Sequence, residues 1–207
     1  MNWEGFEALG DYVKQRAGEG ALIPVERREV LGLLAVRIRE EMENKDPVQL
    51  IFICTHNSRR SNMSQLWAQL ASRYYGVDGI RCFSGGTEVT AFNPRAVKAM
   101  QDAGMKILTL DSSANPSYAV SFENGMEEIK AFSKKYSDPP NPAKGFIAVM
   151  TCSDADEACP IVHGAASRFT VRYEDPRAFD GTPEEEARYA ERCCQITREM
   201  LYLFSKV

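Results

Sequence analysis

No stretch of the 207-residue sequence is apolar for the length that a bilayer-spanning helix needs, so we expect no membrane span. Residues 1–7 have neither the basic nor the apolar region of a secretory signal peptide. No internal repeat is present. The formal net charge of −4 gives the chain no global attraction for nucleic acid or for a membrane surface. These absences predict a cytoplasmic protein with neither kind of partner.

The sequence has six cysteines, most of which should be reduced in the cytoplasm. Any disulfide among them is therefore expected to be catalytic rather than structural. A chain of this length, with 44% hydrophobic residues, can bury a core without disulfide bonds. The composition predicts a soluble globular protein of one domain, or of one domain with an appendage.

The first part of the chain, residues 1–47, has a helical pattern. Apolar side chains recur on one helical face at Leu31, Leu34, Ile38 and Met42. We interpret residues 1–47 as an N-terminal helical extension whose apolar face packs on the core of the main domain.

Residues 48–207 alternate strands with helices. The strands are expected at residues 50–54, 79–83, 145–151 and 168–171. This alternation predicts an α/β fold, a three-layer sandwich in which a four-stranded parallel sheet has helices on both faces. Ligands of such sheets bind beyond the carboxyl ends of the strands, where Cys54, Ser84 and Cys152 are expected to meet.

The alternation is interrupted by an insert at about residues 111–145. Residues 118–122 favour a short strand, and residues 126–136 favour a helix with Ile129 and Phe132 on one face. The main domain is therefore expected to consist of residues 48–207 with this insert.

The segment Cys54-Thr-His-Asn-Ser-Arg-Arg60-Ser61 follows an apolar strand and precedes a helix. A loop in this position turns successive backbone N–H groups inward at the positive end of a helix dipole, which makes an anion cradle. Cys54 is the expected nucleophile, because the cradle favours its thiolate. Arg60 supplies a planar fork for a tetrahedral oxyanion. The expected oxyanion-binding residues are Thr55, His56, Asn57, Ser58, Arg59, Arg60 and Ser61.

Leaving-group chemistry also needs a proton donor. Asp175 lies in Tyr173-Glu-Asp175-Pro176, just after the last expected strand and so near the same edge of the sheet. A carboxylic acid on this loop can protonate a departing oxygen. An Asp-Pro pair by itself is usually only a turn, and its position after a strand in a chain with the cradle favours the catalytic interpretation.

A second cysteine pair, Cys152 and Cys159, stands seven residues apart in Cys152-Ser-Asp-Ala-Asp-Glu-Ala-Cys159-Pro. As a helix this segment is about 10.5 Å long, whereas a disulfide needs Cα atoms roughly 4.4–6.8 Å apart. The two thiols can therefore join only if the helix unwinds. The spacing is not that of a zinc pair, and two unrelated buried cysteines remain the alternative.

Taken together, these segments resemble the thioredoxin-coupled arsenate reductases, which share the low-molecular-weight protein tyrosine phosphatase fold. The other matching segments are Ser84-Gly-Gly-Thr-Glu88, Asn93-Pro-Arg-Ala-Val97 and Glu174-Asp175-Pro176. The two-cysteine segment is the most specific part of the resemblance, because ordinary phosphatases of this fold lack it.

The resemblance implies a mechanism. Cys54 would attack arsenate held by the loop and Arg60, while Asp175 protonates the leaving hydroxyl. Cys152 would then attack Cys54 and release arsenite, and Cys159 would attack Cys152 to form a Cys152–Cys159 disulfide. A thioredoxin-like partner would reduce that disulfide, so electrons would come from a thiol reductant and no bound cofactor is expected.

Some positions depart from the family pattern. His56 replaces the usual Gly, and Arg59 stands where Cys or Ala is common. Gln65 stands where some members place a glutamate for a potassium site, so no metal site is predicted. The alternative function is a low-molecular-weight protein tyrosine phosphatase, or a small-phosphoester phosphatase. It would work through a Cys54 phosphocysteine, with the same arginine and acid.

Overall fold

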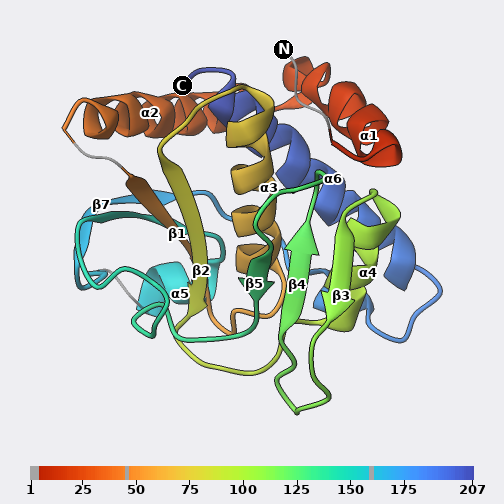
Figure 1. The fold of residues 1–207 in the computed structure, drawn as a ribbon. Coiled ribbons are helices and arrows are strands. Elements are labelled where there is room, and N and C mark those ends of the chain that lie inside the picture. Colours follow the sequence, from red (N-terminus) through yellow and green to blue (C-terminus); the bar gives the residue numbers. More distant parts are fainter. Residues whose placement is uncertain (1–4, 45–46, 159–160) are drawn as a thin grey trace.

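The computed structural model describes residues 5–44, 47–158 and 161–207 of the chain (Figure 1). Its helices are α1 (Glu7–Ala17), α2 (Val25–Met42), α3 (Arg60–Tyr74), α4 (Pro94–Asp102), α5 (Ser153–Ala158) and α6 (Glu185–Phe204), with the 3-10 turns η1 (Gly20–Leu22) and η2 (Pro176–Phe179). Its strands are β1 (Val48–Cys54), β2 (Ile80–Gly86), β3 (Lys106–Thr109), β4 (Tyr118–Ser121), β5 (Ile129–Ala131), β6 (Phe146–Met150) and β7 (Ala165–Thr170). Within these described ranges no helix is both long and apolar enough to cross a membrane.

The central sheet is parallel, with its strands in the order β2-β1-β6-β7. Alternate residues of β1 face opposite sides of it. Leu50 and Phe52 lie in the core that α3 and α6 share, whereas Ile51 and Ile53 pack with Ala155 of α5. Helices therefore cover both faces of the sheet, and the predicted α/β sandwich with a four-stranded parallel sheet is confirmed.

The carboxyl ends of β1 and β6 lie next to each other in this sheet. Ile53 is in register with Met150, and the N–H of Thr151 donates to the carbonyl of Ile53 at 2.7 Å. Cys54 is the last residue of β1, and Cys152 lies just beyond β6. The strand pairing therefore holds both cysteines at one edge of the sheet.

Strand β2 continues beyond its predicted end at residue 83. Gly86 pairs with Cys54 in register, and its N–H donates to the carbonyl of Lys134 at 2.8 Å. Gly85 and Gly86 are places where another backbone approaches closely. A Cβ on Gly86 would lie 2.4 Å from the carbonyl oxygen of Glu88.

The insert forms a second, antiparallel sheet in the order β3-β4-β5. The predicted strand at residues 118–122 is observed, but the predicted helix at residues 126–136 is wrong. Residues of β5 pair with β4 instead, with Ala131 opposite Tyr118. Tertiary hydrogen bonding overrides a local helical pattern here, because the edge of β4 needs a partner for its backbone groups.

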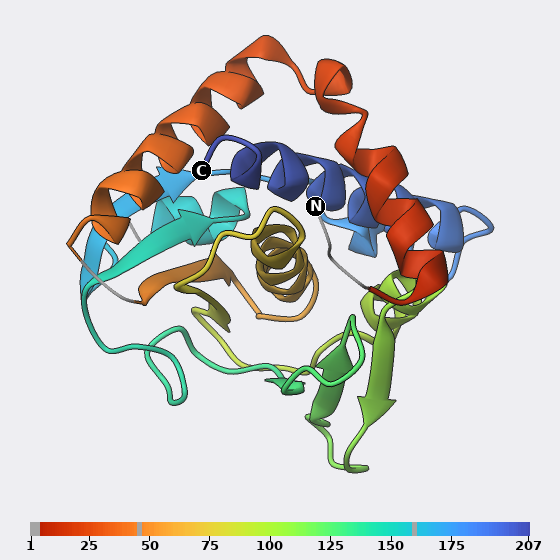
Figure 2. The ribbon, with the colours of Figure 1, turned by 45° about the horizontal axis from the view of Figure 1, so that its top comes forward.

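The N-terminal helices arch over α6, as Figure 2 shows. Leu31, Leu34 and Ile38 are fully buried in the same core as β1 and α6, as the helical pattern predicts. Met42 is 39% exposed, contrary to that pattern, and Glu41 is buried in its place. Met42 is the last residue of α2, where the helix ends and no longer presents its apolar face to the core.

Candidate active site

The loop between β1 and α3 has the backbone shape that an anion cradle requires. Asn57 adopts a positive φ of 45°, which its short polar side chain tolerates. Its amide donates to Ser61 Oγ at 2.8 Å, and Ser61 Oγ lies 3.1 Å from the Cys54 sulfur. The hydroxyl of Ser61 is thus positioned to donate a hydrogen bond to the thiolate of Cys54 at the start of α3.

Buried polar groups support the loop from behind. Asn62 donates to the carbonyl of Asn57 at 2.6 Å and accepts from Ser84 Oγ at 3.1 Å. Asn141 in turn donates to the carbonyl of Ser84 at 2.9 Å, and the backbone N–H of Lys134 donates to the Asn57 amide oxygen at 3.0 Å. Because each of these contacts is buried, they fix the loop before any anion binds.

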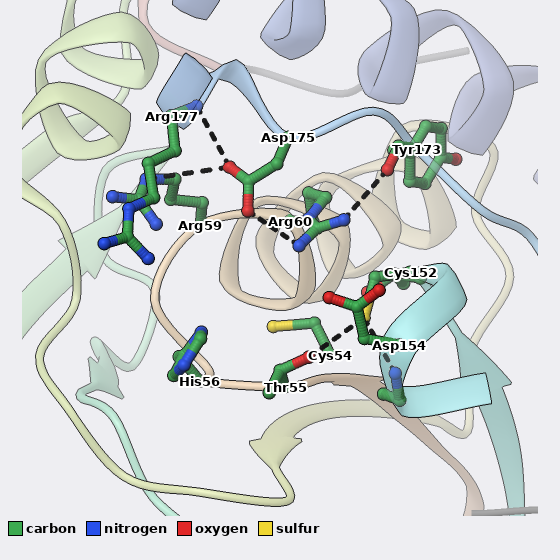
Figure 3. A network of polar contacts seen from close by, with 12 residues as sticks. Cys54, Thr55, His56, Arg59, Arg60, Cys152, Asp154, Tyr173, Asp175 and Arg177 are labelled. Carbon is green, nitrogen blue, oxygen red and sulfur yellow. Dashed lines mark hydrogen bonds and ion pairs between the residues drawn. The ribbon is translucent and has the colours of Figure 1, made fainter. Parts of the chain in front are cut away.

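The proposed acid and the proposed anion ligand meet at the cradle. Arg60 donates to the Asp175 carboxylate at 2.7 Å and to the carbonyl of Tyr173 at 3.0 Å (Figure 3). Asp175 also accepts from the N–H of Arg177 at 3.1 Å, and so caps the start of η2. A bound oxyanion would compete with Asp175 for the Arg60 fork.

Arg59 contacts α6 and both ends of η2. Its Nε donates to the Tyr189 hydroxyl at 2.8 Å, and that hydroxyl donates to Asp180 at 2.8 Å. Its guanidinium also lies 3.5 Å from Asp180 and 3.9 Å from Asp175. Figure 3 shows the Asp175 carboxylate between Arg59 on one side and Arg60 on the other.

The side chains of His56 and Thr55 lie at the rim of the loop. His56 Nε2 is 3.5 Å from the Glu88 carboxylate. Thr55 Oγ1 is 3.5 Å from the sulfur of Cys152. A second thiol therefore lies against the residue that immediately follows Cys54.

Cys152 precedes α5 and is fully buried. The N–H of Ala155, in the first turn of α5, donates to its sulfur at 3.4 Å. Cys159, the third cysteine of the predicted relay, lies outside the described residues. The described cysteines, namely Cys54, Cys82, Cys152, Cys193 and Cys194, are free thiols.

Helix α5 is tied to the sheet through Asp156. This carboxylate accepts from Thr170 at 3.0 Å and from Arg172 Nε at 2.8 Å, and it also pairs with Arg168. Burial by itself would raise the pKa of Asp156, but the hydrogen bonds from Arg172 and Thr170 and the charge of Arg168 together lower it. The segment that must unwind in a disulfide relay is therefore held by charged hydrogen bonds.

A polar cleft of about 400 Å³ opens beside the cradle. Its lining comes from Arg60, α5 and the segment before η2, and consists of Arg60, Ser153, Asp154, Arg172, Tyr173, Glu174 and Asp175. The cleft gives a small anion access to Arg60 and Asp175, the proposed anion ligand and acid.

Comparison with known proteins gives the family. The model of the low molecular weight phosphotyrosine protein phosphatase family matches residues 49–123. An arsenate reductase of Bacillus subtilis is 32% identical over 151 residues, which are 73% of this chain and 88% of that protein. This chain belongs to the arsenate reductase family of the low-molecular-weight protein tyrosine phosphatase superfamily. It is therefore an enzyme of that superfamily.

A second relative and a solved structure are also similar to this chain. An arsenate reductase of Bacillus licheniformis is 29% identical over 157 residues, 76% of this chain and 94% of that protein. Among solved structures, a low molecular weight protein tyrosine phosphatase from T. tengcongensis has a TM-score of 0.53 at 14% identity. The match covers 77% of this chain and 99% of that one. At this identity the likeness supports the fold alone.

The sequence analysis did not predict four residues that support the site of this arsenate reductase family member. Asn62 and Asn141 support the loop, and Asp180 and Tyr189 hold Arg59. Asn62 could have been found, because a polar residue in the first turn of the helix after the cradle is well placed to bond the loop. The other three come from distant segments, and only the fold brings them to the site.

Proposed function

We propose that this protein reduces arsenate to arsenite by a thiol relay that starts at Cys54. The observation that carries the proposal is the contact of 3.5 Å between Cys152 Sγ and Thr55 Oγ1, the residue next to Cys54. Hydrolysis of a phosphoester needs only one thiol at the cradle. A second buried thiol at the rim of the cradle favours a reaction that oxidises two thiols to a disulfide.

The first step uses the cradle. The Cys54 thiolate, with Ser61 Oγ 3.1 Å away, forms a bond to arsenic. The displaced hydroxyl leaves as water after it takes a proton from Asp175. Arg60, which pairs with Asp175 at 2.7 Å, would turn its fork to the bound oxyanion.

The second step uses Cys152. Its thiolate forms an S–S bond with Cys54, the Cys54–arsenic bond breaks, and the electron pair of that bond remains on arsenic. Arsenic is thereby reduced from As(V) to As(III), and the two thiols are oxidised to a disulfide. Cys159 would then attack Cys152, release the Cys54 thiolate and leave a Cys152–Cys159 disulfide.

The last disulfide needs an electron donor from outside the chain. We propose a thioredoxin-like dithiol protein in the cytoplasm, where cysteines such as the five described free thiols stay reduced. Two electrons from the donor would restore Cys152 and Cys159 as thiols. No bound cofactor enters the cycle.

The test measures two reactions of the same protein. With thioredoxin, thioredoxin reductase and NADPH present, NADPH loss is followed after arsenate is added, and hydrolysis of an aryl phosphate is followed in parallel. Cys152→Ser and Cys159→Ser should abolish arsenate turnover and largely spare hydrolysis. Cys194→Ser, which changes a half-buried thiol on α6, is the matched control and should spare both reactions.

A second candidate is phosphatase activity through a Cys54 phosphocysteine. The contact of Arg60 with Asp175 at 2.7 Å favours it, because an anion ligand and an acid stand together beside the nucleophile. If the parent protein hydrolyses aryl phosphate and fails to reduce arsenate, the phosphatase function is supported and the reductase function is wrong. Equal losses of both reactions in the Cys152 and Cys159 variants would also contradict the reductase function.

A further inference from the structure

Arg27, in the first turn of α2, reaches the segment that carries Asp175. Its guanidinium donates to the carbonyl oxygen of Arg172 and lies over the ring of Tyr173, with 5.4 Å between Cζ and the ring centroid. The same guanidinium lies 3.7 Å from the Glu199 carboxylate of α6. One side chain of the N-terminal extension thus contacts two successive residues that lead to Asp175.

Two of the three partners of Arg27 are buried. Tyr173 is 4% exposed and Glu199 is 2% exposed. A buried carboxylate needs a cation or hydrogen-bond donors, and Glu199 has Arg27 together with the amide of Gln195 at 3.0 Å. Burial and the charge of Glu199 raise the pKa of Tyr173, so its ring remains a neutral surface for the guanidinium.

Tyr173 links Arg27 to Arg60 and Asp175 through a ring contact, a backbone hydrogen bond and an ion pair. Its N–H donates to the carbonyl of Thr151 at 3.0 Å, just beyond β6, and its carbonyl accepts from Arg60 at 3.0 Å. Arg60 also holds Asp175 at 2.7 Å. A displacement of Tyr173 would therefore move both the anion ligand and the acid.

The family match begins at residue 49, and α2 lies before it. We propose that Arg27 is a positioning residue, through which the N-terminal extension holds the Tyr173–Asp175 segment over the anion cradle. The kinetic effects that this inference predicts rest on the proposed Cys54 chemistry. It gives residues 25–42 a part in catalysis that goes beyond packing against the core.

The test compares Arg27→Gln with Arg28→Gln, which removes the neighbouring charge from the same helix. Arg28 is half-buried, and no hydrogen bond or ion pair of its side chain is found among the described residues. Values of kcat/KM are measured for phenyl phosphate and for p-nitrophenyl phosphate, whose leaving group needs less protonation. Arg27→Gln should lower the value for phenyl phosphate by roughly tenfold, part of what a general acid contributes. The value for p-nitrophenyl phosphate should fall much less.

Two further variants separate positioning from stability. Arg27→Gln should cause a smaller loss in an Asp175→Asn background, because the part of its effect that acts through that acid is already gone. Arg27→Lys should recover part of the loss, since it keeps the charge near Glu199. A merely structural defect would lower the amount of active enzyme, and both substrates would then lose the same factor.

Amide hydrogen exchange provides a readout that does not depend on activity. Arg27→Gln should speed exchange at the amides of Tyr173 and Arg177, and Arg28→Gln should leave it unchanged. If neither the exchange rates nor the difference between the two substrates separated the variants, the inference would be overturned. If the parent protein turned over neither arsenate nor aryl phosphate, the proposed function would fail, and the exchange result would still decide the role of Arg27.

Discussion

Asp156 accepts a hydrogen bond of 2.8 Å from Nε of Arg172, and so ties α5 to the segment that leads to Tyr173 and Asp175. The same carboxylate accepts from Thr170 at 3.0 Å. In the proposed relay α5 must unwind before Cys152 and Cys159 can join. The contacts of Asp156 therefore oppose the motion that the second half of the cycle needs.

We predict that Asp156→Asn destabilises the protein and speeds formation of the Cys152–Cys159 disulfide. Losing charged hydrogen bonds at a largely buried site should lower the free energy of unfolding by about 2 kcal/mol. Urea unfolding measures the first effect, and thiol trapping with mass spectrometry after a single arsenate turnover measures the second. Glu157→Gln, an exposed change on the same helix, is the control. Slower disulfide formation in Asp156→Asn would contradict the prediction.

Arg59 joins both ends of η2, since it lies 3.9 Å from Asp175 and 3.5 Å from Asp180. We predict that Arg59→Gln lowers kcat/KM for aryl phosphate by roughly tenfold, or about 1.4 kcal/mol of transition-state stabilisation. Arg95→Gln, which removes a more exposed arginine 3.9 Å from Asp180, should have a much smaller effect. Steady-state kinetics decide this, and equal losses in the two variants would exclude a special role for Arg59.

Lys134 carries a buried amine beside the cradle. Its Nζ lies 4.7 Å from the centroid of the Phe132 ring, and burial lowers the pKa of Lys134 to about 8. Below pH 8 the amine is charged in both the folded and the unfolded state. Between this value and the unfolded pKa of about 10.4, only the unfolded state keeps the proton, so stability rises with pH across that window.

We predict that Lys134→Met removes this pH dependence. Between pH 8 and pH 10.5 the free energy of unfolding of the parent protein should rise by about 3 kcal/mol more than that of Lys134→Met. Urea titrations of both proteins at several pH values measure it. A constant difference between the two proteins over that window would show that Lys134 is not held in a low-dielectric site.

Two glycines are predicted to respond to alanine in opposite directions. In Gly86→Ala the new Cβ would lie 2.4 Å from the carbonyl of Glu88 and 2.7 Å from that of Thr55, so the cradle must shift and both stability and turnover should fall. A Cβ on Gly32 of α2 meets nothing within 4 Å, so Gly32→Ala should raise stability by about 0.8–1 kcal/mol through helix propensity. Thermal unfolding with activity measurements checks both.

Features that depend on neighbouring residues could be predicted from the sequence. The loop from Cys54 to Ser61 is contiguous, and its strand, positive-φ asparagine and following helix all lie within a few residues. The parallel sheet was also predictable, because residues 50–54 of β1 and all of β6 are continuous apolar runs buried on both faces. The helix predicted at 126–136 was wrong, because its local pattern did not include the hydrogen-bonding demand of β4.

The sequence by itself determined the make-up of the cradle, since the proposed nucleophile, the loop and the arginine are set by order along the chain. Only the tertiary structure decided what holds that cradle. Asn141 reaches Ser84 across 57 positions, and Arg27 reaches Arg172 across 145. Such contacts depend on how separate segments bury their polar groups together, and no local pattern records which distant group will supply the missing partner.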